Sequence, residues 1–402
     1  MENKIQYNRL LSHVKDLKQV LLVTTGRTGS DFFQSLLDGH EEILQITGIF
    51  FFHKFWESAV CKENLNDLIH EFIWHTQHSI HIAKFKSKYN KLERWDQLGE
   101  NKNEDFELDI EKFKIHMKNL MQDKRINSIN FFFCVHISYA LLMEQDVLKT
   151  KILFYHSHHI DELKKFSLDF KKFDVICTLR DPRNTIVSGI EHHKNYNFLT
   201  FNSKSIANVY LRVFQESEPI LEFSKQVYTI KLEDLHKYPQ IVLGQFCKKY
   251  NLILKDSLFI SSYHSKQWWG DKISGKYLKG FNLNIDKKKW QRHFFVYENL
   301  IFEFLLFKRL SAYNYKIDSK FNSIVFAPIV FFLIILPLKY EILALYLNLK
   351  NKNQKNKTKL VIFALFAYSK RISLYFNYLF KRLFNKVYIS NHLYNLKLDA
   401  ED

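Results

Sequence analysis

Four short apolar runs along the chain are each followed by a turn or by the start of a helical pattern. They cover residues 19–25, 151–155, 173–179 and 226–231. Apolar runs of this length are typical of strands that are buried on both faces, and helical segments between them favour a parallel sheet. We therefore predict an α/β fold in which helices flank a central parallel sheet. Ligands of such sheets bind at the carboxyl ends of the strands.

The longest interval between the predicted strands is mostly helical in pattern. Residues 50–145 are rich in His, Phe and Trp, and 106–122 carries apolar residues at helical spacing. The composition excludes a disordered chain, because 47% of the 402 residues are hydrophobic and 16% are aromatic. We predict one α/β domain over residues 1–315 and a helical, hydrophobic and basic extension over 316–402.

The extension contains two apolar segments. The first, 324–338, has no charge, but Pro328 and Pro337 interrupt it, and it is shorter than the ~20 residues that a membrane-spanning helix needs. It suits a re-entrant segment, an interfacial segment or a core helix. In the second, 360–389, a helix would place several polar side chains on one side. They are Lys370, Arg371, Asn377, Lys381 and Arg382.

The net charge is +17, and it is concentrated in the extension. Residues 342–398 include 11 Lys or Arg and no Asp or Glu. A basic amphipathic helix predicts binding to an anionic membrane surface, whereas the alternative is a helix that covers the domain with its lysines in solvent. No nucleic-acid recognition motif accompanies the charge. Because the N-terminus has no apolar signal segment, we expect a cytoplasmic protein on the inner face of a membrane.

A glycine turn follows the first predicted strand and precedes a helix. It consists of Gly26, Arg27, Thr28, Gly29, Ser30 and Asp31. Turns of this kind aim backbone N–H groups at an anion, often a phosphate. The Gly-Lys-Ser/Thr ending of an ATP-binding P-loop is missing. The alternative is an ordinary strand-to-helix turn that uses glycines for its geometry.

A second candidate anion site follows the strand at 173–179. Asp181 can cap a helix that begins at Pro182, which places Arg180 at the strand end and Ser188 within the helix. A guanidinium and a hydroxyl brought together there could hold a phosphate. The alternative is that Arg180 pairs with a carboxylate and that Ser188 is solvated.

Histidines crowd the end of the strand at 151–155. They are His156, His158 and His159. Histidine suits a general base at neutral pH, and the alternative is packing without a role in proton transfer. A zinc site is disfavoured because adjacent histidines on a strand point apart and no carboxylate–cysteine set accompanies them. We expect no metal.

Together the two anion motifs resemble the sulfotransferases that use 3'-phosphoadenosine-5'-phosphosulfate (PAPS). The resemblance rests on TTGRTGSDFF at 24–33 and LRDPRNTIVSGI at 179–190, and it spans about residues 18–315. In that family the first loop holds the 5'-phosphosulfate, whereas an Arg and a Ser eight positions apart, as Arg180 and Ser188 are, hold the 3'-phosphate. The strand and helix pattern at 227–252 is also similar to the family's.

The resemblance also implies roles for individual residues. The family's base lies 22 residues before its phosphate-binding arginine, which points to His158, with His156 in reserve. A basic loop closes over the 3'-phosphate, and Lys276 and Lys279 match it best. Many members have Lys where this chain has Arg27. Arginine keeps the positive charge but cannot donate a proton, so we expect electrostatic stabilisation from Arg27.

The predicted function is sulfuryl transfer from PAPS, without a metal, to a hydroxyl or amine of a carbohydrate or lipid-linked acceptor. Residues 50–145 are expected to form the acceptor pocket, with Trp56, Trp74 and Trp95 among the aromatics, which would equally suit a core. The alternatives are a P-loop kinase or NTPase and a non-catalytic, membrane-associated nucleotide-binding protein.

Overall fold

The computed structural model describes most of the chain. The described residues are 2–24, 26–59, 64–80, 98–104, 106–158, 160–196, 201–215, 227–270, 280–285, 290–318, 320, 322–351, 356–384 and 393–395.

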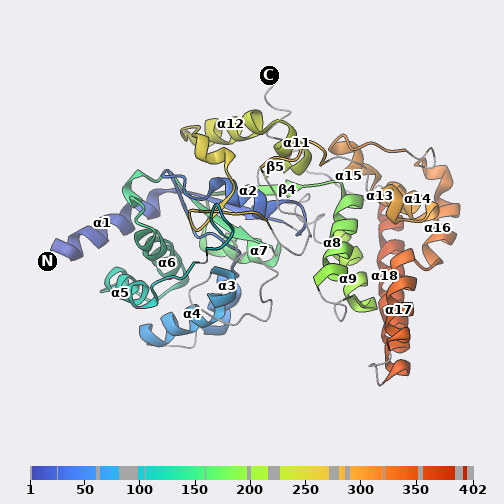
Figure 1. Cartoon of the computed structure of the whole chain (residues 1–402), viewed down its shortest axis with the longest axis horizontal. Helices are drawn as coiled ribbons and strands as arrows, with labels where there is room; N and C mark the ends of the chain where they lie inside the picture. Colours follow the sequence, from blue (N-terminus) through green and yellow to red (C-terminus); the bar gives the residue numbers. More distant parts are fainter. Residues whose placement is uncertain are drawn as a thin grey trace.

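A six-stranded parallel sheet lies at the centre of one part of the molecule (Figure 1). Its strand order is β2-β3-β1-β4-β5-β8. The strands are β1 (Lys18–Val23), β2 (Ile43–Gln45), β3 (Ile152–Ser157), β4 (Phe173–Leu179), β5 (Val227–Lys231) and β8 (Leu393–Asn395). All five pairings between neighbours are parallel. The predicted α/β fold with a central parallel sheet is therefore confirmed.

Helices cover both faces of this sheet. On one face lie α2 (Ser30–Leu37), α11 (Leu232–Lys237) and α12 (Pro239–Tyr250). On the other lie α1 (Glu2–Asp16), α3 (Phe52–Ala59), α4 (Leu65–Ile80), α5 (Ile110–Met121), α6 (Ser128–Leu142) and α7 (Ile160–Asp169). The side chains of β1 alternate between the two cores: Leu21 and Val23 face one, and Val20 and Leu22 face the other. The continuous apolar runs thus reflect burial on both faces.

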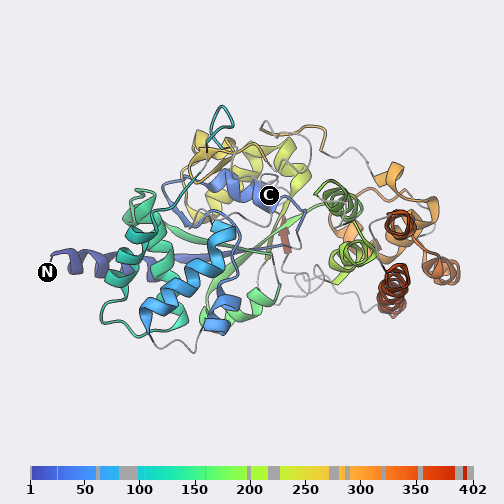
Figure 2. The same ribbon diagram turned by 60° about the horizontal axis from the view of Figure 1, so that its bottom comes forward.

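A helical body lies beside the sheet, as the two ribbon views agree (Figures 1 and 2). Its helices are α8 (Pro182–Tyr196), α9 (Ser203–Gln215), α13 (Trp290–His293), α14 (Val296–Leu305), α15 (Phe307–Ala312), α16 (Ala327–Ile335), α17 (Lys339–Lys350) and α18 (Lys357–Leu383). They share one hydrophobic core, which includes Ile186 and Phe214 before residue 315 and Tyr375 after it. The C-terminal helices are therefore packed on α8 and α9.

Short elements complete the described chain. They are the 3-10 turns η2 (Val147–Lys149), η4 (Asp256–Phe259) and η6 (Ile324–Phe326), and the two-stranded ribbon of β6 (Ser262–Tyr263) and β7 (Lys266–Gln267).

The start of α3 is held by side chains from the sheet and from α7. The backbone N–H of Phe52 donates to the Tyr155 hydroxyl (3.0 Å), and the N–H groups of His53 and Lys54 donate to the Glu162 carboxylate (3.1 and 3.0 Å). These contacts satisfy donors that a helix cannot pair internally, and they place a negative charge at its positive end.

The buried ring of His53 joins the same network, which predicts a pH-dependent stability. Burial lowers its pKa, but Asp169 and Glu162, 3.2 and 3.4 Å away, outweigh burial and raise the pKa overall. A raised pKa in the folded state means that this stabilisation is complete below the unfolded pKa of about 6.5 and is lost as pH rises through the folded value. His53→Gln should cost ~2 kcal/mol at pH 6 and clearly less at pH 9 in urea unfolding. An equal cost at both pH values would contradict the charged pair.

Candidate functional site

The loops that follow β1 and β4 lie next to each other, at the point where the order of the strands in the sheet reverses. The chain leaves β1 toward β2, on one side, and leaves β4 toward β5, on the other. Because β1 and β4 are neighbours, their carboxyl ends flank a topological switch point, which is where open α/β sheets bind ligands. The glycine turn follows β1, and Arg180 follows β4.

Three buried threonine hydroxyls form a hydrogen-bonded cluster at the base of the glycine turn. The hydroxyls of Thr28 and Thr178 lie 2.9 Å apart, and that of Thr178 lies 3.4 Å from that of Thr24. Thr24 and Thr28 also share a hydrogen bond. The turn is thereby fixed to the ends of both β1 and β4.

The backbone of the turn has the left-handed geometry that anion-binding loops use. Gly26, Arg27 and Gly29 have φ angles of 82°, 59° and 89°. A Cβ atom on Gly29 would lie 2.2 Å from Cδ1 of Leu232, so this position needs glycine for both its φ angle and its space. Helix α2 starts at the next residue, Ser30, and its first N–H groups are not paired within the helix.

The side chain of Arg27 connects this turn to the second motif. Its Nε lies 3.4 Å from the Ser188 hydroxyl on α8. Burial lowers the pKa of Arg180, the nearby charge of Arg27 lowers it further, and Glu233 opposes the shift. Within the described part of the chain, the buried Nε of Arg180 has no hydrogen-bond partner. Two guanidinium groups and a hydroxyl thus converge where an anion would relieve their repulsion.

Two histidines on α8, which the sequence analysis did not single out, border this cluster. Burial and then the charge of Arg27 lower the pKa of His192 to about 3. The pKa of His193 is also lowered, by burial and by Arg212 and Arg27. His192 is therefore neutral at pH 7, and the positive charge of the cluster comes from its arginines. The sequence could have indicated these two histidines, because they follow Ser188 by about one helical turn on α8.

His158 and His156 lie on the other side of the turn. Nε2 of His158 is 3.2 Å from the Ser30 hydroxyl and 3.7 Å from Oδ1 of Asp31. The His158 side chain is 25% exposed, whereas His156 is buried. Of these two histidines, His158 is therefore the one that an acceptor can reach.

Gln34 fixes the tautomer of His156. The Gln34 amide nitrogen donates to the carbonyls of Ile46 (3.0 Å) and Gly48 (3.4 Å), so its oxygen faces Nδ1 of His156, 2.8 Å away. Nδ1 must therefore carry the hydrogen, which leaves the lone pair on Nε2.

These histidines and Asp31 form a group that could hold a metal ion. One ligand atom from each of Asp31, His156 and His158 lies within 4.8 Å of the others. The expectation that the strand-end histidines point apart is wrong for His156 and His158, because residues two apart on a strand share a face. A carboxylate also accompanies them. Two imidazoles and a carboxylate suit zinc and similar divalent ions.

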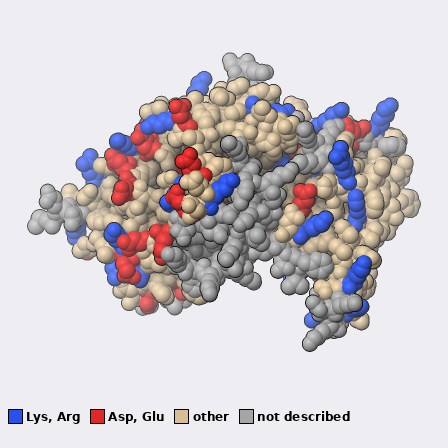
Figure 3. Space-filling view, viewed as in Figure 1, with Lys and Arg blue, Asp and Glu red and all other residues tan. Residues whose placement is uncertain are grey.

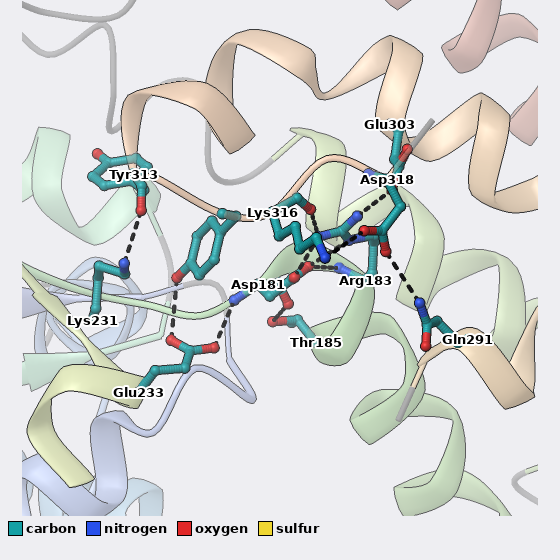
Figure 4. Close-up of polar contacts among 11 residues, drawn as sticks. Asp181, Arg183, Thr185, Lys231, Glu233, Gln291, Glu303, Tyr313, Lys316 and Asp318 are labelled. Carbon is teal, nitrogen blue, oxygen red and sulfur yellow. Dashed lines mark hydrogen bonds and ion pairs between the residues drawn. The ribbon is translucent and has the colours of Figure 1, made fainter. Parts of the chain in front are cut away.

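The second motif also anchors α8, through contacts shown in Figure 4. Asp181 accepts the Arg183 N–H (2.9 Å), as a helix cap does, and its carboxylate pairs with the Arg183 guanidinium (2.7 Å). Arg183 is buried and also reaches Glu303 (2.5 Å) and the face of Trp290 (4.1 Å). The Asp181 N–H donates to Glu233 (3.1 Å). The second arginine of Arg-Asp-Pro-Arg therefore fixes α8 to its surroundings.

The remaining predicted residues fall into two groups. Lys276, Lys279, His159 and Trp95 are outside the described residues. Trp56 packs against Phe52 and Phe131 of the core, with ring centroids 6.2 and 5.7 Å apart. Trp74 is 54% exposed on α4.

Comparisons with known proteins give only distant similarity to solved structures. No protein-family model matches the sequence, and no curated protein matches it. Among solved structures, a sulfotransferase domain from the curacin biosynthetic pathway is similar, with 16% identity and a TM-score of 0.36. The match covers 75% of this chain and 99% of that domain. A similarity this low does not determine the activity.

Proposed function

We propose that this protein is a sulfotransferase that moves a sulfuryl group from PAPS to a hydroxyl or amine of a carbohydrate or lipid-linked acceptor. One observation carries the proposal: Arg27 of the glycine turn lies 3.4 Å from Ser188 and close enough to Arg180 to lower its pKa. These contacts support the proposal that the two motifs that resemble the PAPS-binding motifs form one cationic site at the switch point of the sheet.

Each part of the cluster has a role in the proposed reaction. The N–H groups of the turn and of the start of α2 would bind the 5'-phosphosulfate, and Arg180 and Ser188 would bind the 3'-phosphate. The predicted closing loop with Lys276 and Lys279 belongs to the same proposal. Arg27 would offset the charge that grows on the leaving phosphate, which such preorganised donors do most effectively in a water-poor site.

His158 would act as the base that takes the proton from the acceptor hydroxyl or amine. The acceptor oxygen or nitrogen attacks sulfur, the bond between sulfur and the phosphate oxygen breaks, and 3'-phosphoadenosine-5'-phosphate leaves. The acceptor proton passes to an imidazole nitrogen of His158. Ser30 and Asp31, 3.2 and 3.7 Å from its Nε2, would orient the ring. These contacts support His158, and not the buried His156, as the base.

Binding of the product nucleotide tests the proposal. We expect 3'-phosphoadenosine-5'-phosphate to bind at least tenfold more tightly than 5'-AMP in titration calorimetry, because only the former carries a 3'-phosphate. Arg180→Ala should remove most of this difference, since a charge-assisted hydrogen bond contributes ~1.5–3 kcal/mol. Arg9→Ala, on the exposed face of α1, is the matched control and should bind as the wild type does.

Other outcomes would redirect the assignment. Equal affinity for the two nucleotides would contradict the 3'-phosphate site. Tight binding without transfer of labelled sulfate from PAPS to extracts of the source membranes would favour the non-catalytic alternative. Magnesium-dependent ATP turnover would favour a kinase or NTPase.

A further inference from the structure

The helical body exposes a large apolar surface, which we call the apolar patch. On α16 and just after it the patch comprises Ile329 (47% exposed), Phe331 (41%), Phe332 (69%), Ile335 (45%) and Leu336 (43%). On α17 it comprises Ile342 (47%) and Tyr346 (56%), and on α18 Val361, Ile362, Phe363, Leu365 and Phe366 (36–66%). Isolated exposed apolar residues are ordinary, but a contiguous set on packed helices marks an interaction surface.

Residues 360–367 of α18 are apolar around most of the helix circumference. At 100° per residue, the exposed positions 361, 362, 363, 365 and 366 spread over more than half of the helix, and Ala367 is the buried side. A helix that is apolar on nearly all sides requires a partner or a membrane.

Two of the five polar residues that the sequence predicted to share one outer side of α18 are buried, whereas Lys370 and Asn377 are exposed. Arg371 is fully buried, pairs with Glu341 (2.9 Å) and donates to the carbonyls of Ile334 and Leu336. Arg382 is buried over the ring of Phe304 (3.8 Å). The predicted orientation is therefore wrong at these two positions: both guanidinium groups are paired or stacked inside, and apolar side chains face outward instead.

Arg371 also fixes the bend between α16 and α17. It satisfies carbonyls at the C-terminal end of α16 and at Leu336, where the chain turns before Pro337. The segment Ile324–Lys350 is long and apolar enough to cross a membrane by length and composition, and 28% of its apolar 18-residue stretch is buried. The bend divides it into helices of 9 and 12 residues, each short of the ~20 that a span needs.

Lysines border the patch where α17 ends and α18 begins. Lys350, Lys357 and Lys359 are exposed there. Lys350 and Lys359 lie 5.8 and 5.7 Å from the ring centroids of Tyr346 and Phe363. Figure 3 shows mainly Lys and Arg among the charged side chains over the C-terminal helices on the face in view. Positive charge beside an apolar surface matches anionic lipid and would repel a second copy of the same surface.

We propose that the apolar patch docks on a membrane that contains anionic lipid and enters its interface without crossing it. The N-terminal turns of α18 and the outer sides of α16 and α17 lie among the headgroups and upper acyl chains. Lys350, Lys357 and Lys359 contact lipid phosphates. The proposal does not depend on the enzymatic assignment.

Vesicle sedimentation of the full chain tests the contribution of the apolar side chains and that of the lysines separately. We expect binding to phosphatidylcholine vesicles with 30% phosphatidylglycerol and at least tenfold weaker binding without the anionic lipid. Phe363→Ser/Phe366→Ser should weaken binding about tenfold or more on both vesicle types. Lys357→Gln/Lys359→Gln should do so only on the anionic vesicles.

Matched controls use exposed residues of the other part of the molecule. Ile115→Ser/Leu168→Ser removes apolar side chains that are 55% and 73% exposed, and Lys112→Gln/Lys118→Gln removes lysines on α5. Neither should change vesicle binding. All variants should keep the wild-type midpoint of urea unfolding, which shows that a change in vesicle binding is not a loss of fold and which does not require nucleotide binding.

Three results would overturn the proposal. One is unchanged vesicle binding by Phe363→Ser/Phe366→Ser. Another is retention of the membrane-bound chain after alkaline carbonate extraction, which would show a span. The third is a wild-type dimer in analytical ultracentrifugation that this double variant dissociates, without vesicle binding by either form.

Discussion

His158→Ala is expected to slow sulfuryl transfer by about 10²–10⁴-fold, because it removes the proposed base from the acceptor side of the glycine turn. His158 is partly exposed and contacts the side chains of Ser30 and Asp31, whereas the proposed contacts to the 5'-phosphate are backbone N–H groups. Affinity for 3'-phosphoadenosine-5'-phosphate should therefore stay within about twofold of the wild type. Single-turnover transfer of labelled sulfate, measured beside calorimetric binding, separates the two effects.

His156→Ala provides the informative comparison. His156 is buried and donates to Gln34, so its loss should lower the unfolding midpoint, as removal of a buried hydrogen-bonded side chain does. His158→Ala should leave that midpoint nearly unchanged. Wild-type turnover by His158→Ala, with strong loss in a folded His156→Ala, would transfer the role of base to His156.

Arg183→Ala is expected to have the largest effect on stability, with a loss of about 3–5 kcal/mol. The substitution would leave two buried carboxylates, Asp181 and Glu303, without their guanidinium partner. It would also remove the cation above Trp290. Urea unfolding followed by circular dichroism measures the loss, and Arg9→Ala is the control of equal chemistry on an exposed helix.

A double-mutant cycle shows whether the pair itself is responsible. Glu303→Gln removes the charge of one partner but keeps the shape of its side chain. If Arg183 and Glu303 are coupled as the 2.5 Å contact indicates, the cost of Arg183→Ala should fall in the Glu303→Gln background. Additive effects would show that the stability comes from the other contacts of Arg183, with Asp181 and Trp290.

The sheet was predictable where the hydrophobic pattern alone determines a strand. The runs at 19–25, 151–155, 173–179 and 226–231 correspond to β1, β3, β4 and β5. By contrast, β2 and β8 have three residues each, too few for a periodic signal, and pair only because the neighbouring strand presents an edge.

The positions of some candidate residues were predictable, but their partners were not. Helix capping foretold the start of α8, and strand alternation would have placed His156 and His158 on one face. The inward direction of Arg371 was hidden, because it depends on Glu341, 30 residues earlier, and on carbonyls of α16. Periodicity assigns a charged residue to solvent unless such a partner is known.

Helix α8 begins just after the carboxyl end of β4, and its middle contributes Ile186, Val187 and Ile190 to the core of the helical body. The same helix therefore carries Ser188 of the proposed donor site and packs, through α9, against the helices that bear the apolar patch. On a bound molecule, this rigid connection would hold the reactive centre at a constant height above the lipid headgroups. Acceptors would then be selected by the distance between their reactive hydroxyl or amine and the bilayer surface. This selection would act in addition to recognition of the acceptor by side chains of the site.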